Sequence, residues 1–169
     1  TSIYLGKLGP RGSAIKDNGK SGGSVRVASL FNALINVCSQ GATRRGSLAI
    51  YLDIDHGDID EFLTMRSEGS PIQDLSFGVC VKNDWMKEMI AGDSTKRAVW
   101  AKVIDCRRRT GYPYIFFADN ANDQAPQVYK DHGLTIHAST LCAEIDESIS
   151  EDESLVCCLA SMNDLYFDE

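Results

Sequence analysis

Apolar residues recur along residues 24–38 at the three- and four-residue spacing of an amphipathic helix. Its apolar positions are Val27, Leu30, Phe31, Leu34, Val37 and Cys38. Ser24 is the expected N-cap, and Gly41 ends the helical pattern. Residues 48–54 and 75–81 are short and almost continuously apolar, which predicts strands covered on both faces.

Three further helices and a third strand are predicted downstream. They are a short helix around Phe62 capped by Asp55, a helix from Asn83 or Asp84 to Ile90, a helix over about 95–109 ended by Gly111, and a strand over 112–118. Strands that alternate with helices predict a parallel α/β sheet or barrel with right-handed crossovers. Beyond it, residues 134–136 and 155–159 are expected to form short strands, with Leu141 and Cys142 at the tip of a loop or finger.

Composition narrows the classes of partner. The chain has 169 residues and a net charge of −7, which disfavours a nucleic-acid backbone as partner. No apolar run reaches the roughly 20 residues that span a bilayer. Six cysteines without a secretory signal indicate a reducing, cytoplasmic compartment, and the absence of a C-x-x-C pair predicts no metal site. The chain does not begin with methionine, so we expect a segment of a longer protein.

Two polar, glycine-containing loops are candidate ligand loops. Residues 36–47 carry Gly41, Gly46 and the arginine pair Arg44 and Arg45, which suits a phosphate or a base edge. Residues 9–23 precede a helix, as phosphate-cradling loops do, but match neither the P-loop nor the dinucleotide-binding spacing. A solvated connection between a helix and a strand is the alternative for the first loop.

Sulfur and carboxylate groups mark the C-terminal part of the chain. In S-T-L-C-A-E-I, Cys142 and Glu144 are two residues apart, so on an extended finger their side chains point the same way. Such a pair offers a sulfur centre beside a proton acceptor. In V-C-C-L-A-S-M-N, Cys157 and Cys158 could take part in thiol redox chemistry if Cys157 lies beside Cys142. Buried structural cysteines are the alternative in both motifs.

Taken together and in this order, these motifs resemble the catalytic subunit of aerobic ribonucleotide reductases. The segments that carry the resemblance are C-S-Q-G-A-T-R-R-G-S, G-Y-P-Y-I-F-F-A-D-N-A-N, S-T-L-C-A-E-I and V-C-C-L-A-S-M-N. The resemblance implies that residues 1–169 are part of a ten-stranded α/β barrel with a central finger loop. Effector and specificity loops would lie within residues 9–47, and the finger loop and redox cysteine within residues 134–163.

The resemblance also assigns roles to individual residues. Cys142 looks like the cysteine whose transient thiyl radical abstracts the ribose 3′ hydrogen, and Glu144 looks like the acceptor of the 3′-hydroxyl proton. Cys157 looks like one member of the reducing cysteine pair, whose partner in the family lies upstream of this chain's first residue. The sequence departs from the family at Thr140, where asparagine usually binds the substrate. Thr140 is therefore the expected substrate contact here: its hydroxyl can donate or accept a hydrogen bond, but it is shorter than asparagine and lacks the two amide donors.

Allosteric control is implied by the same resemblance. Residues 38–46 look like the specificity loop, residues 15–23 look like its partner loop for effector phosphate, and the helix over 24–38 would lie in a homodimer interface. The residues expected to contact effector or substrate base are Lys16, Ser39, Gln40, Gly41 and Arg44.

The resemblance implies a ribonucleoside-diphosphate reductase that makes deoxyribonucleotides for DNA synthesis, with no covalently bound cofactor. It implies ATP and dNTP effectors, the remainder of the large subunit, thioredoxin or glutaredoxin, and a small subunit that supplies the radical from a dimetal centre. Leu141 favours that source over adenosylcobalamin, whose users usually carry N-P-C-G-E at this motif. A regulatory or split-subunit nucleotide-binding module without catalysis is the alternative.

Overall fold

The computed structural model describes residues 1–39, 45–146, 148 and 160–163. Within them the sheet has four parallel strands in the order β1-β2-β3-β4. The strands are β1 (Ser2–Tyr4), β2 (Ala49–Asp53), β3 (Ser76–Val81) and β4 (Tyr114–Phe117). The parallel α/β sheet predicted from the alternation of strands and helices is therefore confirmed.

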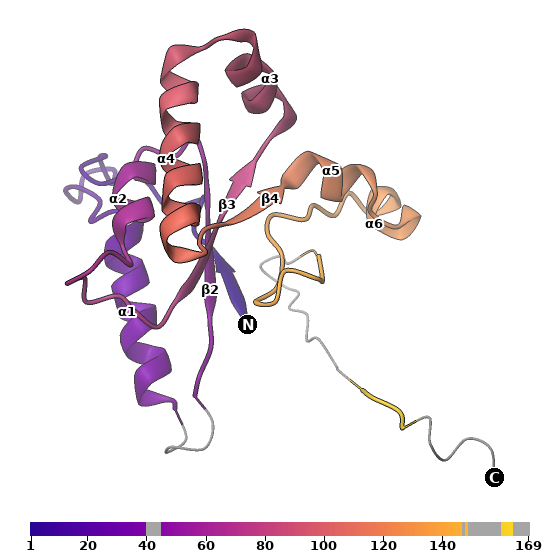
Figure 1. Cartoon of the computed structure of the whole chain (residues 1–169), viewed down its shortest axis with the longest axis horizontal. Helices are drawn as coiled ribbons and strands as arrows, with labels where there is room; N and C mark the ends of the chain where they lie inside the picture. Colours follow the sequence, from indigo (N-terminus) through magenta and orange to yellow (C-terminus); the bar gives the residue numbers. More distant parts are fainter. Residues whose placement is uncertain (40–44, 147, 149–159, 164–169) are drawn as a thin grey trace.

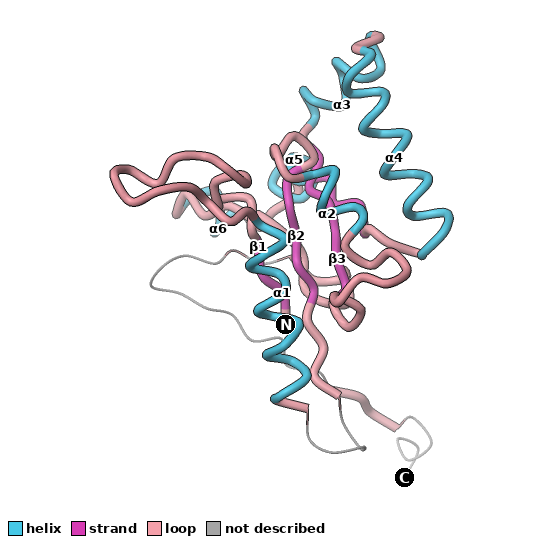
Figure 2. Tube along the Cα trace, turned by 90° about the vertical axis from the view of Figure 1, so that its left-hand side faces the viewer, coloured by secondary structure: helices cyan, strands magenta, loops and turns pink. Residues whose placement is uncertain are grey.

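Six helices accompany the sheet in the described residues. They are α1 (Ser24–Val37), α2 (Ile59–Thr64), α3 (Asn83–Ala91), α4 (Ser94–Thr110), α5 (Ala118–Asp123) and α6 (Gln127–Asp131). Helices α1, α2 and α4 lie on one side of the sheet, whereas α5, α6 and residues 132–146 lie on the other (Figure 1). Figure 2, seen from the helical side, shows α1 and α2 in front of the strands.

The two faces of the sheet bury different sets of side chains because strand residues alternate in direction. Leu52 and Phe77 belong to the main core beneath the helices. There the rings of Phe77 and Phe62 pack edge to face, with their centroids 5.4 Å apart. Tyr51 and Cys80 belong to a second cluster on the opposite face. Each fully buried large apolar side chain contributes on the order of 2 kcal/mol. The second cluster is smaller, and hydrogen-bonding side chains lie within it and beside it.

Ser24 is not the N-cap that the sequence pattern predicted. Gly23 occupies the cap position with a φ of 85°, and Ser24 is the first helical residue. The N–H and hydroxyl of Ser24 donate to the buried carboxylate of Asp58. A tertiary partner has therefore replaced the local cap, and Asp58 rather than Asp55 directly precedes α2.

Other helix and strand predictions are confirmed with small shifts. Gly111 ends α4 in the left-handed conformation, with a φ of 78°. Residues 134–136 do not form a regular strand, and the second predicted short strand, 155–159, lies outside the described residues. In the part of the chain that the structure describes, no helix is both long and apolar enough to cross a membrane.

Candidate functional site

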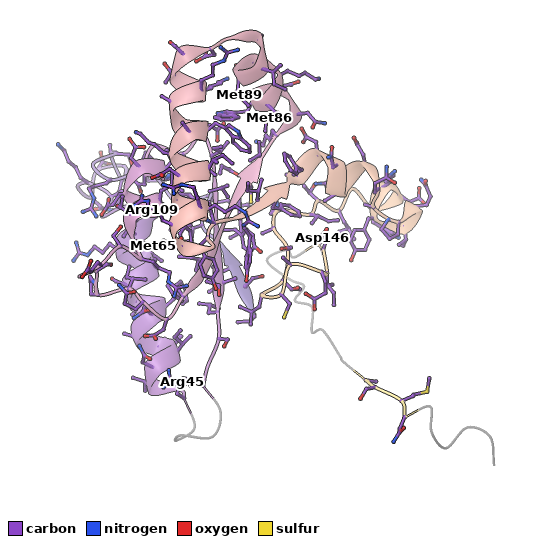
Figure 3. The ribbon with its side chains drawn as sticks, in the orientation of Figure 1. Arg45, Met65, Met86, Met89, Arg109 and Asp146 are labelled. Atoms are coloured by element: carbon purple, nitrogen blue, oxygen red, sulfur yellow. The ribbon has the colours of Figure 1, made fainter. Side chains whose placement is uncertain are left out.

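Residues 134–146 run along the face of the sheet opposite α1, α2 and α4. In Figure 3 the labelled side chains of Met65, on the side of the helices, and Asp146, at the end of this segment, lie on opposite sides of the sheet. The side chain of Asn122, in α5, makes the first attachment. Its amide donates to the carbonyl of Ile136 at 2.9 Å, and its oxygen accepts the N–H of Ile136 at 2.9 Å. One side chain thus satisfies both backbone groups of a residue that belongs to no strand.

His137 makes the second attachment. The thiol of Cys80 donates to the His137 carbonyl at 3.3 Å, and the His137 ring stacks on Tyr4 with centroids 5.1 Å apart. Burial raises the pKa of the Cys80 thiol, so this sulfur stays protonated and remains a donor. Burial and the charge of Lys7 lower the pKa of His137, so its ring is neutral at neutral pH. Cys80 is 2% exposed, so it packs in the second cluster and also binds the loop.

Tyr51 makes the third attachment, from the middle of the sheet. Its hydroxyl lies 2.7 Å from the hydroxyl of Ser139 and donates to the carbonyl of Thr140 at 3.2 Å. Tyr51 is fully buried, and burial raises the pKa of its hydroxyl to about 12. The group is therefore a permanent hydrogen-bond donor at physiological pH.

A tight turn follows these attachments and carries the predicted catalytic pair. The N–H of Thr140 donates to the carbonyl of Ile145 at 2.9 Å, and the N–H of Ala143 donates to the carbonyl of Thr140 at 3.1 Å. Cys142 and Glu144 are exposed on this turn. The tip position predicted for Cys142 is confirmed. The expected extended geometry is wrong here, because Ala143 has a φ of 63° and breaks the strand alternation.

Thr140 presents its backbone rather than its side chain to the protein. Its carbonyl accepts hydrogen bonds from both Tyr51 and Ala143. Its hydroxyl oxygen is buried and has no hydrogen-bond partner within the described residues. The substrate contact predicted for this hydroxyl therefore stays a prediction, made for a group that the described protein leaves unpaired.

The second predicted site lies between α1 and β2. Gln40, Gly41 and Arg44, like the redox candidate Cys157, lie outside the described residues. Ser39 is described: its hydroxyl donates to the carbonyl of Ile35 at 2.8 Å and accepts the N–H of Gly46 at 3.0 Å. Ser39 thus bridges the two ends of this loop.

A hollow of about 460 Å³ adjoins the bridge that Ser39 makes. Its lining residues are Asn36, Ser39, Arg45, Gly46, Ser47 and Asp74. Lys16 lies elsewhere, on the predicted loop over 9–23, where it is exposed and has a φ of 41°. Within the described residues, no group of three His, Cys, Asp or Glu side chains could hold a metal ion.

Sequence reasoning missed the side chains that hold the turn. Tyr51 lies in a predicted strand, and strand alternation placed it on one face without indicating a partner 88 residues away. The usable signal was chemical. A tyrosine within an apolar strand normally has a partner for its hydroxyl when it is buried.

Comparison with known proteins identifies the family of the chain. A family model described as the ribonucleotide reductase barrel domain matches residues 1–96 and 90–166. A Frog virus 3 protein, provisionally named a ribonucleoside-diphosphate reductase large subunit, is 32% identical over 169 residues, covering 89% of this chain and 30% of the relative. The large chain of the enzyme from Encephalitozoon cuniculi is 31% identical over 203 residues, covering 95% and 26% respectively.

A solved structure is similar over the whole chain. The class Id ribonucleotide reductase alpha subunit of Actinobacillus ureae is 52% identical, with a TM-score of 0.86, and the match covers all of this chain and 31% of that one. This chain thus spans between about a quarter and a third of the length of these relatives. By family match, identity and fold, the chain belongs to the ribonucleotide reductase large-subunit family and is part of its barrel domain.

Proposed function

We propose that these residues form the radical-cysteine part of a ribonucleoside-diphosphate reductase large subunit. The observation that carries the proposal is the closed turn from Thr140 to Ile145, which presents Cys142 and Glu144 on the face of the sheet away from the main helices. A thiol and a carboxylate held on one short turn can act on neighbouring atoms of one substrate.

The proposed chemistry assigns each group one task. A thiyl radical on Cys142 takes the hydrogen atom from C3′ of the ribose, which restores the thiol and leaves a carbon radical. Glu144 accepts the 3′-hydroxyl proton while the 2′-hydroxyl leaves as water. Cys157 and a partner cysteine supply two electrons and two protons and become a disulfide. Cys142 then returns its hydrogen to C3′, so the net change is one ribonucleotide reduced and one dithiol oxidised.

The oxidising equivalent for Cys142 would come from a partner subunit. The class I reading rests on Leu141 and on the 52% identity to an alpha subunit named as class Id. A radical-generating dimetal small subunit is therefore the proposed source, rather than adenosylcobalamin. Thioredoxin or glutaredoxin would reduce the disulfide after each turnover.

Allosteric binding is proposed for the loops on either side of α1. The loop over 9–23, with Lys16, would hold the phosphate of an ATP or dNTP effector, and the loop beside Ser39, at the other end of α1, would contact the substrate base. Helix α1 supports a homodimer interface because Leu30, Leu34 and Val37 are all at least half exposed. Exposed apolar side chains on one helix are a common feature of subunit contacts.

A chimera provides the test. These 169 residues would replace the matched segment of the Actinobacillus ureae alpha subunit, and deoxynucleotide formation would be measured with that enzyme's small subunit and a thioredoxin system. We expect Cys142→Ser to abolish turnover. Cys106→Ser, a matched change at a buried cysteine whose thiol donates to the Leu63 carbonyl, should retain it. Turnover by Cys142→Ser would contradict the proposal.

The buried, unpaired hydroxyl of Thr140 favours a second candidate, a nucleotide-binding module without catalysis. Calorimetric titration of the chimera with dNTPs, combined with the assay of deoxynucleotide formation, separates the two functions. Effector binding together with reduction supports the reductase, whereas effector binding in a folded chimera that never reduces a ribonucleotide supports the module.

A further inference from the structure

Tyr51 lies across the sheet toward the catalytic turn because its strand neighbour is a glycine. Tyr51 and Gly78 are paired in the register of β2 and β3. A Cβ atom on Gly78 would lie 2.3 Å from Cε1 of Tyr51, well inside van der Waals contact. The tyrosine ring therefore occupies the space that any other side chain at position 78 would fill.

The hydroxyl groups of Tyr51 and Ser139 lie 2.7 Å apart and form a hydrogen-bonded pair in which either can be the donor. The Thr140 carbonyl can only accept, and both hydroxyls reach it, Tyr51 at 3.2 Å and Ser139 at 3.4 Å. The pair thus fixes two consecutive residues of the loop on the sheet.

The carbonyl that Tyr51 binds is also the one that closes the turn. The N–H of Ala143 donates to the same Thr140 oxygen at 3.1 Å. Cys142 lies between these two residues, so the position of one oxygen atom determines where the turn places its thiol. Glu144 comes directly after Ala143 and lies within the turn that the hydrogen bond from the Thr140 N–H to the Ile145 carbonyl closes.

We propose that Tyr51 is a positioning residue for the turn that bears Cys142 and Glu144, and that Gly78 is required because it leaves room for the Tyr51 ring. The proposal deepens the reductase function and rests on it. Tyr51 touches neither substrate nor reacting atoms in this scheme; it acts through the Thr140 carbonyl.

Two measurements on the chimera test the proposal, and only one of them requires catalysis. Residue-resolved hydrogen exchange reports whether the turn is held, through the amides of Thr140 and Ala143. Tyr51→Phe keeps the ring and removes the hydroxyl, so both amides should exchange about tenfold faster. In turnover, kcat should fall about 10- to 100-fold with KM within about twofold of the parent, because misplacement affects the transition state more than binding.

The chain offers a matched control, Tyr112→Phe. Tyr112 and Ser76 also form a tyrosine–serine hydroxyl pair, at 3.1 Å, but neither residue lies on the turn. Tyr112→Phe should leave the exchange of Thr140 and Ala143 unchanged. Ser139→Ala should give part of the Tyr51→Phe effect, and the double variant should be no worse than Tyr51→Phe alone.

Gly78→Ala is the second variant, since it displaces the ring without removing the hydroxyl. It should reproduce the faster exchange at Thr140. The proposal is overturned if Tyr51→Phe leaves the exchange of Thr140 and Ala143 at the level of Tyr112→Phe, or if kcat falls without any change in that exchange. A parent chimera that folds but does not reduce ribonucleotides would instead refute the proposed function. The exchange data would still test whether Tyr51 holds the turn, because they do not depend on catalysis.

Discussion

The carboxylate of Asp58 holds Ser24 by two hydrogen bonds, from the backbone N–H at 2.7 Å and from the hydroxyl at 3.0 Å. Its other oxygen accepts the N–H of Arg11 at 2.8 Å. Arg11 and Ser24 lie near the two ends of the loop over residues 9–23. One buried carboxylate therefore closes the base of the proposed effector loop and joins it to the start of α2.

Replacing Asp58 should destabilise the protein through the donors that it leaves behind. Asp58→Ala leaves the Ser24 and Arg11 N–H groups without their acceptor, at a cost of about 2–3 kcal/mol in the free energy of unfolding. Asp60→Ala is the control, because the exposed pair of Asp60 with Lys102 contributes at most about 1 kcal/mol. Urea denaturation of both variants measures the difference, and equal losses would contradict the clamp.

Asp58 should also make stability depend on acid pH. Burial by itself raises the pKa of this carboxyl, but the hydrogen bonds from Ser24 and Arg11 outweigh it, so the pKa lies below its ordinary value of 3.8. A carboxyl with a lowered pKa in the folded state contributes its full stability above the unfolded-state pKa and loses it as pH falls through the folded-state pKa. Unfolding free energies measured from pH 7 down to pH 3 should fall less steeply for Asp58→Asn than for the parent.

The hydroxyl of Thr140 separates stability from activity. A buried hydroxyl without a partner costs on the order of 1–3 kcal/mol, so Thr140→Val should keep or raise the melting temperature. Thr140→Asn would supply the amide usual in the family, with an expected gain in kcat on the order of 10²-fold if that amide binds substrate. A marked drop in the melting temperature of Thr140→Val would show that the hydroxyl has a stabilising partner.

Ala143 should tolerate glycine but not a β-branched residue. Its φ of 63° lies in the left-handed region, which costs roughly 1–2 kcal/mol for a residue with a Cβ atom. Ala143→Gly should leave the free energy of unfolding within about 1 kcal/mol of the parent. Ala143→Val should lose more than that and accelerate exchange of the Thr140 amide. Thermal denaturation of the two variants side by side tests the difference, and equal stability would argue against the left-handed turn.

The main elements could be predicted because their patterns are local. The apolar runs at β2 and β3 and the helical spacing of α1 follow directly from the sequence. Three elements were missed for physical reasons. Strand β1 has only three residues, too few for a pattern, and the short helices α5 and α6 have no buried residue.

The site was only partly predictable. The motif around Cys142 and its family resemblance indicated the loop tip, which the structure confirms. The contacts that hold the tip were not predictable, because Asn122 and Tyr51 act on backbone groups 14 and 89 residues away. Spacing along the chain carries no information about such pairs. The left-handed Ala143 was also unforeseen, since alanine gives no sign of that conformation.

The three attachments of residues 134–146 follow one another along the chain, at Ile136, His137 and the Ser139–Thr140 pair. Because they are arranged in series, each can be lost without the ones before it. Loss of the contacts at Ser139 and Thr140 would release the turn that bears the Cys142 thiol and leave the contacts at Ile136 and His137, and the rest of the sheet, in place. Catalytic failure and unfolding should therefore occur at different temperatures.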